Sequence, residues 1–259
     1  MGILEKMRLD GKKAFVTGGA RGIGKSIAIA LAEAGADVAI VDIDIAEAEK
    51  TAEMIAKNTG VNTFALKVDI TVKEDVDNMI SEMIKRFGRV DVAFCNAGIC
   101  MEIPAEEMTF EEWYKVINTN LNGTFLTAQA AGKAMIAQGE GGSIICTASM
   151  SAHIVNVPQP QCSYNASKAA IIQLCKSLAI EWADHNIRVN TISPGYIGTE
   201  LTLNSPDLAP LIDTWNEMAP LHRMGNPDEL QSIAVYLAGD TSSFTTGADF
   251  IIDGAFTCF

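Results

Sequence analysis

Short runs of apolar residues alternate along the chain with longer segments in which apolar positions recur every three or four residues. The short runs are apolar at nearly every position, which is typical of parallel strands buried on both faces of a sheet. The longer segments have the spacing of helices that cover such a sheet. The pattern predicts strands at Lys13–Thr17, Asp37–Asp42, Thr63–Val68, Val90–Asn96, Ser143–Ala148, Arg188–Ile192 and Asp249–Ile252. It predicts helices at Gly22–Glu33, Ala46–Lys57, Lys73–Phe87, Tyr164–Ala183 and Pro227–Ala238, with one or two more in Thr109–Met135.

This alternation predicts an α/β protein with a doubly wound, seven-stranded parallel sheet and helices on both faces, a single-domain Rossmann fold over residues 1–259. An eight-stranded α/β barrel is the alternative, but the glycine-rich loop after the first strand favours the open sheet. The least regular stretch is Pro194–Asn226, which follows the sixth strand. Because open α/β sheets bind ligands at the carboxyl ends of their strands, we expect this stretch to be a substrate lid.

Composition and charge exclude several classes of protein. The 259 residues are 48% hydrophobic and 20% charged, which is ordinary for a globular chain. The net charge of −13 argues against a nucleic-acid partner. The first residues lack the apolar core of a signal peptide, and no apolar run is long enough to cross a membrane, so we expect a cytoplasmic protein without a membrane partner. Six cysteines without a CxxC pair and three scattered histidines predict neither a disulfide nor a metal site.

The loop after the first strand has the features of a dinucleotide-binding site. It reads Thr-Gly-Gly-Ala-Arg-Gly-Ile-Gly at 17–24 and leads directly into a helix, whose free N–H groups and positive end favour phosphate. Gly18 allows a tight turn, Gly22 lets the backbone approach a pyrophosphate, and Gly24 allows close packing. Asp42 ends the second strand, where a carboxylate accepts hydrogen bonds from the adenosine ribose and repels a 2′-phosphate. We therefore expect NAD, while Arg21 keeps NADP possible.

Seven motifs in order resemble those of the classical short-chain dehydrogenase/reductase family, over essentially the whole chain. They are the glycine loop, Asp69-Ile70, Cys95-Asn-Ala-Gly98, Asn120, Ser149, the Tyr164-x-x-x-Lys168 pair, and Pro194-Gly195 with Thr199. The resemblance implies a catalytic tetrad of Asn120, Ser149, Tyr164 and Lys168. It implies that the cofactor is bound by Gly18, Arg21, Gly22, Ile23, Gly24, Asp42, Asp69, Ile70, Asn96, Ala97, Gly98, Tyr164, Lys168, Pro194, Gly195, Ile197 and Thr199.

The tetrad implies hydride transfer between a secondary alcohol or ketone and a nicotinamide cofactor. Tyr164 exchanges the proton with the substrate oxygen, and Lys168, one helical turn later, is expected to lower the pKa of the phenol. Ser149 holds the substrate oxygen, and by resemblance Asn120 holds a water that relays the proton. The family usually has thirteen positions between its serine and tyrosine. Ser151 satisfies that count, whereas Ser149 directly follows the strand; we favour Ser149, and Ser151 stays open.

The segment before Tyr164 suggests the substrate. Asn156, Gln159 and Gln161 are amides that can pair with several hydroxyls, and the stretch resembles the corresponding loop of polyol and ketose reductases in the family. We therefore expect a polyol/ketose pair. The alternatives are a hydroxysteroid (bile acid) dehydrogenase, which the leucines of Pro194–Asn226 would suit, a 3-oxoacyl-type ketoreductase, and a non-enzymatic NAD sensor, against which the intact tetrad argues.

Two segments suggest self-association. Thr109–Met135 and Ala166–Trp182 carry more apolar residues than one buried face needs, and the tail Gly247–Phe259 is apolar. These are also the elements through which the resembled family assembles. We expect a homotetramer built as a dimer of dimers.

Overall fold

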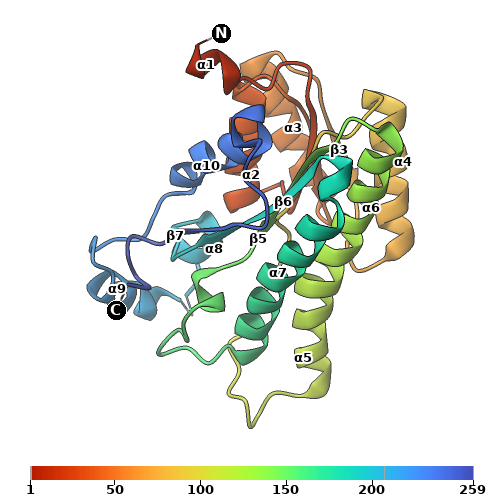
Figure 1. Cartoon of the computed structure of the whole chain (residues 1–259). Coiled ribbons are helices and arrows are strands. Elements are labelled where there is room, and N and C mark those ends of the chain that lie inside the picture. Colours follow the sequence, from red (N-terminus) through yellow and green to blue (C-terminus); the bar gives the residue numbers. More distant parts are fainter. Residues whose placement is uncertain (1, 207, 259) are drawn as a thin grey trace.

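In residues 2–206 and 208–258, which the computed structural model describes, seven parallel strands form one sheet in the order β3-β2-β1-β4-β5-β6-β7 (Figure 1). The strand order reverses beside β1, so the carboxyl ends of β1 and β4 border the crevice where doubly wound sheets bind ligands. The predicted Rossmann fold is confirmed. The strands are β1 (Lys13–Thr17), β2 (Asp37–Asp42), β3 (Thr63–Lys67), β4 (Val92–Cys95), β5 (Gly142–Thr147), β6 (Ile187–Pro194) and β7 (Asp249–Ile252).

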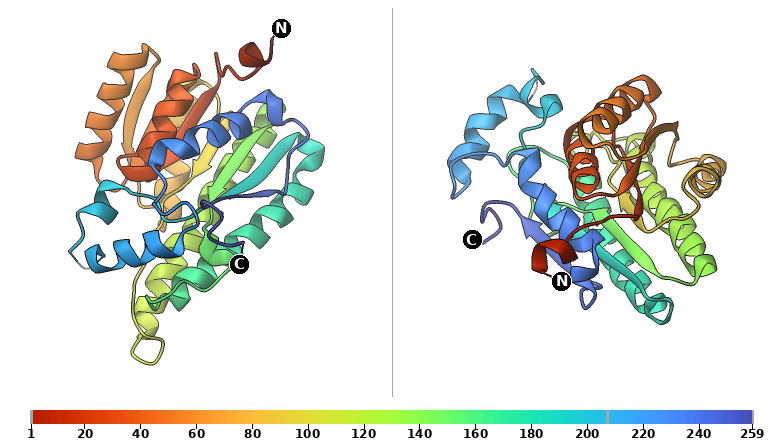
Figure 2. Two further views of the ribbon diagram at one scale, coloured as in Figure 1. Left: turned by 90° about the vertical axis from the view of Figure 1, so that its left-hand side faces the viewer. Right: turned by 90° about the horizontal axis from the view of Figure 1, so that it is seen from above.

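Helices cover the sheet on both sides, and each side has its own hydrophobic core (Figures 1 and 2). One core joins the sheet to α2 (Gly22–Glu33), α3 (Ile45–Thr59) and α10 (Gln231–Ala238). The other joins it to α4 (Lys73–Phe87), α6 (Gly123–Gln138) and α7 (Cys162–Glu181). Strands β1, β2 and β4 are almost entirely apolar because both of their faces are buried.

The segment predicted as one or two helices, Thr109–Met135, is interrupted by a turn of π-helix. It consists of α5 (Phe110–Ile117), the π-helical turn η1 (Asn118–Asn122) and α6. Thr109 starts α5 with a capping box, in which its side chain and that of Glu112 satisfy each other's backbone N–H groups. The π-turn contains Asn120, and such turns often occur at functional sites.

The predicted lid is a separate excursion between β6 and the last helices. It contains the short helices α8 (Glu200–Leu203) and α9 (Ala209–Met218) and returns through η4 (Pro227–Leu230) into α10. Figure 2 shows this segment, in the lighter blues, projecting from the body of the molecule beside the C-terminal tail. The sequence analysis did not predict α1 (Ile3–Lys6), α8 or α9. Within the described residues, no helix has the length and apolarity that a membrane crossing requires.

Candidate active site

The glycine loop follows β1 and has a backbone that side chains would not tolerate. Gly18 and Gly22 have φ values of 61° and 54°, in the left-handed region. A Cβ atom on Gly24 would lie 2.0 Å from the carbonyl oxygen of Gly18. The loop therefore folds tightly against the first turn of α2 and leaves that turn's N–H groups facing the crevice.

The turn after β4 supports this loop. Asn96 donates its side-chain N–H groups to the carbonyl oxygens of Thr17 and Gly18, at 3.1 and 3.3 Å. The Thr17 hydroxyl accepts the backbone N–H groups of Asn96 and Ala97, at 3.0 and 3.2 Å. The motif at 95–98 thus fixes the shape of the glycine loop, in addition to the cofactor contact implied by the resemblance. Gly98 also leaves room for the side chain of Asn120, because a Cβ on this glycine would lie only 3.1 Å from Oδ1 of Asn120.

Asp42 lies at the end of β2, facing the loop from the other side. Its Oδ2 accepts the backbone N–H of Ala20 and its Oδ1 accepts that of Asp44, both at 3.1 Å. Arg21 is already paired: its guanidinium lies 2.7 Å from a carboxylate oxygen of Asp44 and 3.8 Å from one of Glu47. Three carboxylates therefore lie at the end of β2 and the start of α3.

A cavity of about 230 Å³ opens between the glycine loop and the start of the lid. Thr199, the N-cap of α8, comes so close to Gly22 that a Cβ on that glycine would lie 3.3 Å from the threonine methyl group. Gly195 lies against Asp253, leaving no room for a side chain, and Ile197 pairs with Gly225 by a β-bridge. The loop, the free helix end and this cavity together fit a dinucleotide.

Asp69 and Ile70 lie in the turn just after β3, which ends at Lys67, and Ile70 has a structural role as well. Its side chain is buried against α6, where a Cβ on Gly123 would come within 2.6 Å of it. Asp69 accepts the backbone N–H and hydroxyl of Thr71, at 2.9 and 2.7 Å. Any contact of Ile70 with a nucleotide therefore falls mainly to its main chain.

Tyr164, Lys168 and Ser149 meet between α7 and the end of β5. Nζ of Lys168 lies 5.5 Å from the centre of the Tyr164 ring and donates a hydrogen bond of 2.7 Å to the carbonyl oxygen of Thr147. The Ser149 hydroxyl interacts with the Tyr164 phenol in the sense that lowers the pKa of the phenol. The structure thus brings these three residues of the expected tetrad together.

Burial dominates the electrostatics of this group. Burial raises the pKa of Tyr164 to about 12, although the interaction with Ser149 opposes the rise. Burial also lowers the pKa of Lys168 to about 8. Burial and Ser149 dominate this shift, so the lowering of the phenol pKa expected from Lys168 stays a prediction. Tyr164 holds its proton here, as a proton donor to a ketone should.

Asn120 is fully buried and joins three elements. Its Oδ1 accepts the backbone N–H of Ile99 at 2.8 Å, and its Nδ2 donates to the carbonyl oxygen of Ile99 and to the hydroxyl of Ser167, at 2.9 and 3.0 Å. Both amide hydrogens are used inside the protein. A water held by Asn120 would therefore bind to its oxygen atoms.

The two candidate serines face different partners. Ser149 interacts with Tyr164, whereas the Ser151 hydroxyl donates to Oδ1 of Asn156 at 2.5 Å and accepts from Gln161 at 3.2 Å. The two serine hydroxyls lie 3.1 Å apart. The geometry favours Ser149 as the residue that meets the substrate oxygen, with Ser151 behind it.

The amides of the segment before Tyr164 do not face open solvent. Asn156, Gln159 and Gln161 are buried, and Gln161 donates a hydrogen bond to Oδ1 of Asn156. Asn156 and Gln159 donate to the Tyr196 hydroxyl at 3.0 and 2.8 Å, and Gln159 accepts the indole N–H of Trp215 at 3.3 Å. The interpretation that all three amides are free to bind substrate hydroxyls is therefore wrong. Their hydrogen bonds are committed to the protein.

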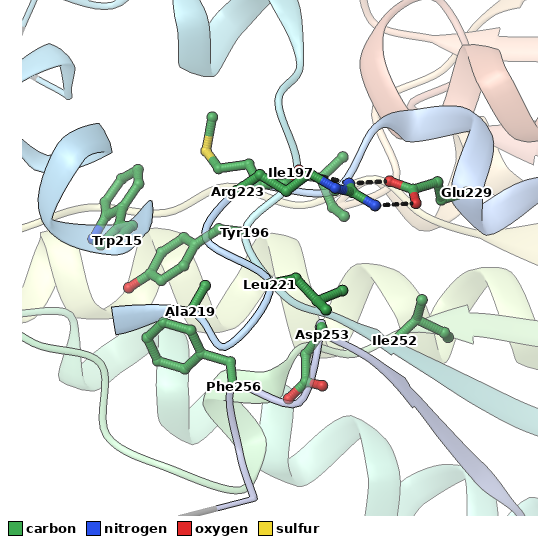
Figure 3. Close-up of a pocket in the computed structure, with 13 residues that line it drawn as sticks. Tyr196, Ile197, Trp215, Ala219, Leu221, Arg223, Glu229, Ile252, Asp253 and Phe256 are labelled. Atoms are coloured by element: carbon green, nitrogen blue, oxygen red, sulfur yellow. Dashed lines mark hydrogen bonds and ion pairs between the residues drawn. The ribbon is translucent and has the colours of Figure 1, made fainter. Parts of the chain in front are cut away.

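Sequence reasoning missed three residues of this region: Thr147, Ser167 and Tyr196. Thr147 and Ser167 act through contacts between distant segments, which no local pattern reveals. Tyr196 directly follows the Pro-Gly motif, so its aromatic character was the available signal, whereas Trp215 is one of the apolar lid residues that would suit a hydroxysteroid. Behind these two rings is a second cavity of about 150 Å³, closed at one end by the Arg223–Glu229 ion pair (Figure 3).

Comparison with known proteins agrees with this geometry. A family model described as enoyl-(acyl carrier protein) reductase matches residues 18–257. A crystal structure of a short-chain type dehydrogenase/reductase from Mycobacterium marinum superposes with a TM-score of 0.96, at 44% identity over 100% of both chains. This chain belongs to the short-chain dehydrogenase/reductase family. As a short-chain dehydrogenase/reductase, it is an oxidoreductase of alcohol and carbonyl groups that uses a nicotinamide cofactor.

Three curated short-chain relatives align over nearly their whole length. A probable NADP-dependent mannitol dehydrogenase of Yarrowia lipolytica is 42% identical over 99% of this chain and 91% of its own. A sorbose reductase of Candida albicans is 40% identical over 99% of this chain and 90% of its own. A galactitol 2-dehydrogenase of Rhizobium johnstonii is 39% identical over the full length of both proteins.

Proposed function

We propose that this enzyme catalyses the reversible oxidation of a polyol to a ketose. The observation that carries the proposal is the full-length similarity, at about 40% identity, to a mannitol dehydrogenase, a sorbose reductase and a galactitol dehydrogenase. The exposed leucines of the lid, Leu201 and Leu203, favour a second candidate, a hydroxysteroid.

The proposed mechanism assigns one function to each tetrad residue. A bound nicotinamide cofactor would supply the acceptor for a hydride from the carbinol carbon, and the hydride donor in the reverse direction. Ser149 holds the substrate oxygen against Tyr164, which takes up or gives back the proton. Lys168 would bind the ribose next to the nicotinamide. Asn120 holds the main chain of Ile99 in place and binds the water that relays the proton. The residues from Gly18 to Thr199 that are named above would hold the cofactor.

We propose NAD as the preferred cofactor. The names of the relatives and the residues of the site favour different cofactors, since the Yarrowia mannitol dehydrogenase is named for NADP. In this chain, however, Asp42 ends β2, where the resemblance implies a ribose contact, and Asp44 and Glu47 already neutralise Arg21. A 2′-phosphate would meet three carboxylates and no unpaired arginine in the described part of this loop.

We also propose that the enzyme is a cytoplasmic homotetramer of one-domain subunits, each with a lid over residues 194–226. Phe110 on α5 and Ile180 on α7 expose 73% and 82% of their surface, which favours a covered face between subunits. The C-terminal tail offers less apolar surface to another subunit than expected, because Phe256 packs on Tyr196 of its own chain. Phe259 lies outside the described residues. Six free thiols suit a reducing compartment.

The test is a substrate panel with NAD⁺ and NADP⁺ in both directions. It includes hexitols, ketoses, bile-acid hydroxysteroids and a 3-oxoacyl thioester. Turnover of a hexitol or ketose, with better kcat/KM than the other classes, supports the proposal. Hydroxysteroid turnover at micromolar concentrations, with hexitols inactive at tens of millimolar, would overturn it.

A further inference from the structure

Helix α9 of the lid has one fully buried side chain that contacts the rest of the protein, and Met218 at its end packs against the cluster of Met150, Ala219 and Phe256. Among the described residues of α8 and α9, Trp215 is the only one that is buried, with 3% of its surface exposed. The leucines of α8 are largely exposed. The position of this part of the lid therefore depends on what Trp215 contacts.

Trp215 makes two directed contacts, both with residues near the catalytic group. Its ring stacks on that of Tyr196, with centroids 4.1 Å apart and planes 10° from parallel. Its indole N–H donates to Oε1 of Gln159 at 3.3 Å. Figure 3 shows Tyr196 between Trp215 and Phe256, whose ring meets it edge-on at 5.3 Å. A stacked ring with a paired N–H defines both the distance and the rotation of the helix.

These contacts continue without a break to Ser149. The Tyr196 oxygen accepts the amides of Gln159 and Asn156, Asn156 accepts the Ser151 hydroxyl, and Ser151 bonds to Ser149. Each link joins side chains that are largely removed from water. Breaking one link leaves a buried polar group unpaired, which makes the chain of bonds act as a unit.

We propose that Trp215 and Gln159 form a latch that holds α9 closed, and that Gln159 is a positioning residue for Ser149. Gln159 is the branch point: its carbonyl oxygen binds the lid through Trp215, and its amide binds Tyr196, from which the hydrogen bonds lead to Ser149. The inference rests on the proposed function only in taking Ser149 as the serine that meets the substrate. In this arrangement, closure of the lid and orientation of Ser149 occur together.

Two single variants and their combination test the latch. Trp215→Phe keeps a ring but loses the N–H; it should speed amide hydrogen exchange in residues 209–218 about tenfold and raise KM by a similar factor, the effect of losing one hydrogen bond. Gln159→Leu should do the same and should also lower kcat severalfold, because the relay to Ser149 is broken. The double variant should match Gln159→Leu, since both changes remove the same bond.

The matched control is Trp113→Phe on α5, which lies outside this network. It should leave exchange in residues 209–218 and KM unchanged, and nucleotide affinity should be unchanged in every variant. Any one of three results would overturn the latch. These are amide exchange in Trp215→Phe at the wild-type rate, multiplicative effects in the double variant, and a wild-type kcat for Gln159→Leu. If Gln159→Leu does not fold, Gln159→Met takes its place. Exchange is measured without substrate, so a failed polyol assignment would leave this result standing.

Discussion

Nζ of Lys168 lies 2.7 Å from the main-chain oxygen of Thr147, so the amine of α7 is fixed directly to the end of the central strand β5. Only 3% of the lysine is exposed. A buried ammonium with a carbonyl acceptor is held in place more firmly than a surface lysine, but it is also easier to deprotonate.

This burial predicts that alkaline pH stabilises the fold. The pKa of Lys168 is about 8 in the native state and 10.5 in the unfolded chain, so between these values the unfolded chain binds more protons. Between pH 8 and 9 the unfolding free energy should rise by up to about 1.4 kcal/mol per pH unit. Urea denaturation at several pH values in this range checks the prediction, and Lys168→Met should flatten the dependence. Above pH 9 the raised pKa of Cys100 acts in the opposite direction, and above pH 10 that of Tyr164 does so too.

Tyr164→Phe should abolish turnover and leave the nucleotide bound. The phenol is the proton donor, and its loss should reduce kcat by about 10³-fold or more. Fluorescence titration with the reduced nucleotide should give an unchanged Kd. Substantial residual turnover would mean that another group carries the proton.

The two serines should respond differently to replacement by alanine. Ser149→Ala removes the hydroxyl that interacts with Tyr164 and should lower kcat about 10²-fold or more. Ser151→Ala removes a supporting hydrogen bond and should cost about tenfold or less. Steady-state kinetics on the best substrate of the panel decides between them, and the reverse order would assign the catalytic position to Ser151.

Asp42→Ala should move cofactor preference toward NADP. The substitution removes the carboxylate that faces the ribose, and with it the repulsion of a 2′-phosphate. The ratio of kcat/KM for NAD⁺ to that for NADP⁺ should fall about tenfold or more. A wild-type enzyme that already prefers NADP⁺ would show that Asp42 does not set the preference.

Gly24→Ala should damage the cofactor site far more than a comparable change elsewhere. The new methyl group would lie 2.0 Å from the Gly18 carbonyl, so the loop must move, at a cost of about 3 kcal/mol or more. Gly60→Ala is the control: that glycine has φ of 77° but open space around it, so the cost is about 1 kcal/mol. Thermal denaturation and nucleotide titration of both variants measure the difference.

The sheet and the glycine loop could be predicted from sequence because their signals are local. A strand buried on both faces is apolar throughout, and Gly18–Gly24 is a contiguous motif between a strand and a helix. The π-turn at Asn118–Asn122 could not be predicted in this way, since its residue types also suit an ordinary helix. The pKa of Tyr164 depends on burial by segments distant in sequence.

The amide cluster shows the same limit. Asn156, Gln159 and Gln161 have the residue types of a substrate-binding loop, and nothing local indicates that Tyr196, 35 or more positions later, accepts two of their N–H groups. The similarity to polyol enzymes was visible in the same stretch. The amides of this stretch shape the wall of the site, whereas the sequence suggested that they pair with substrate hydroxyls.

The buried contacts of α9 are separate from the exposed leucines of α8. Leu201 and Leu203 expose 84% and 53% of their surface and belong to neither hydrophobic core. Replacing them changes the exposed surface of the lid at almost no cost in stability, as long as Trp215 and its partners stay. That surface is thus open to stepwise change, one exposed side chain at a time, while the catalytic group beneath it is preserved.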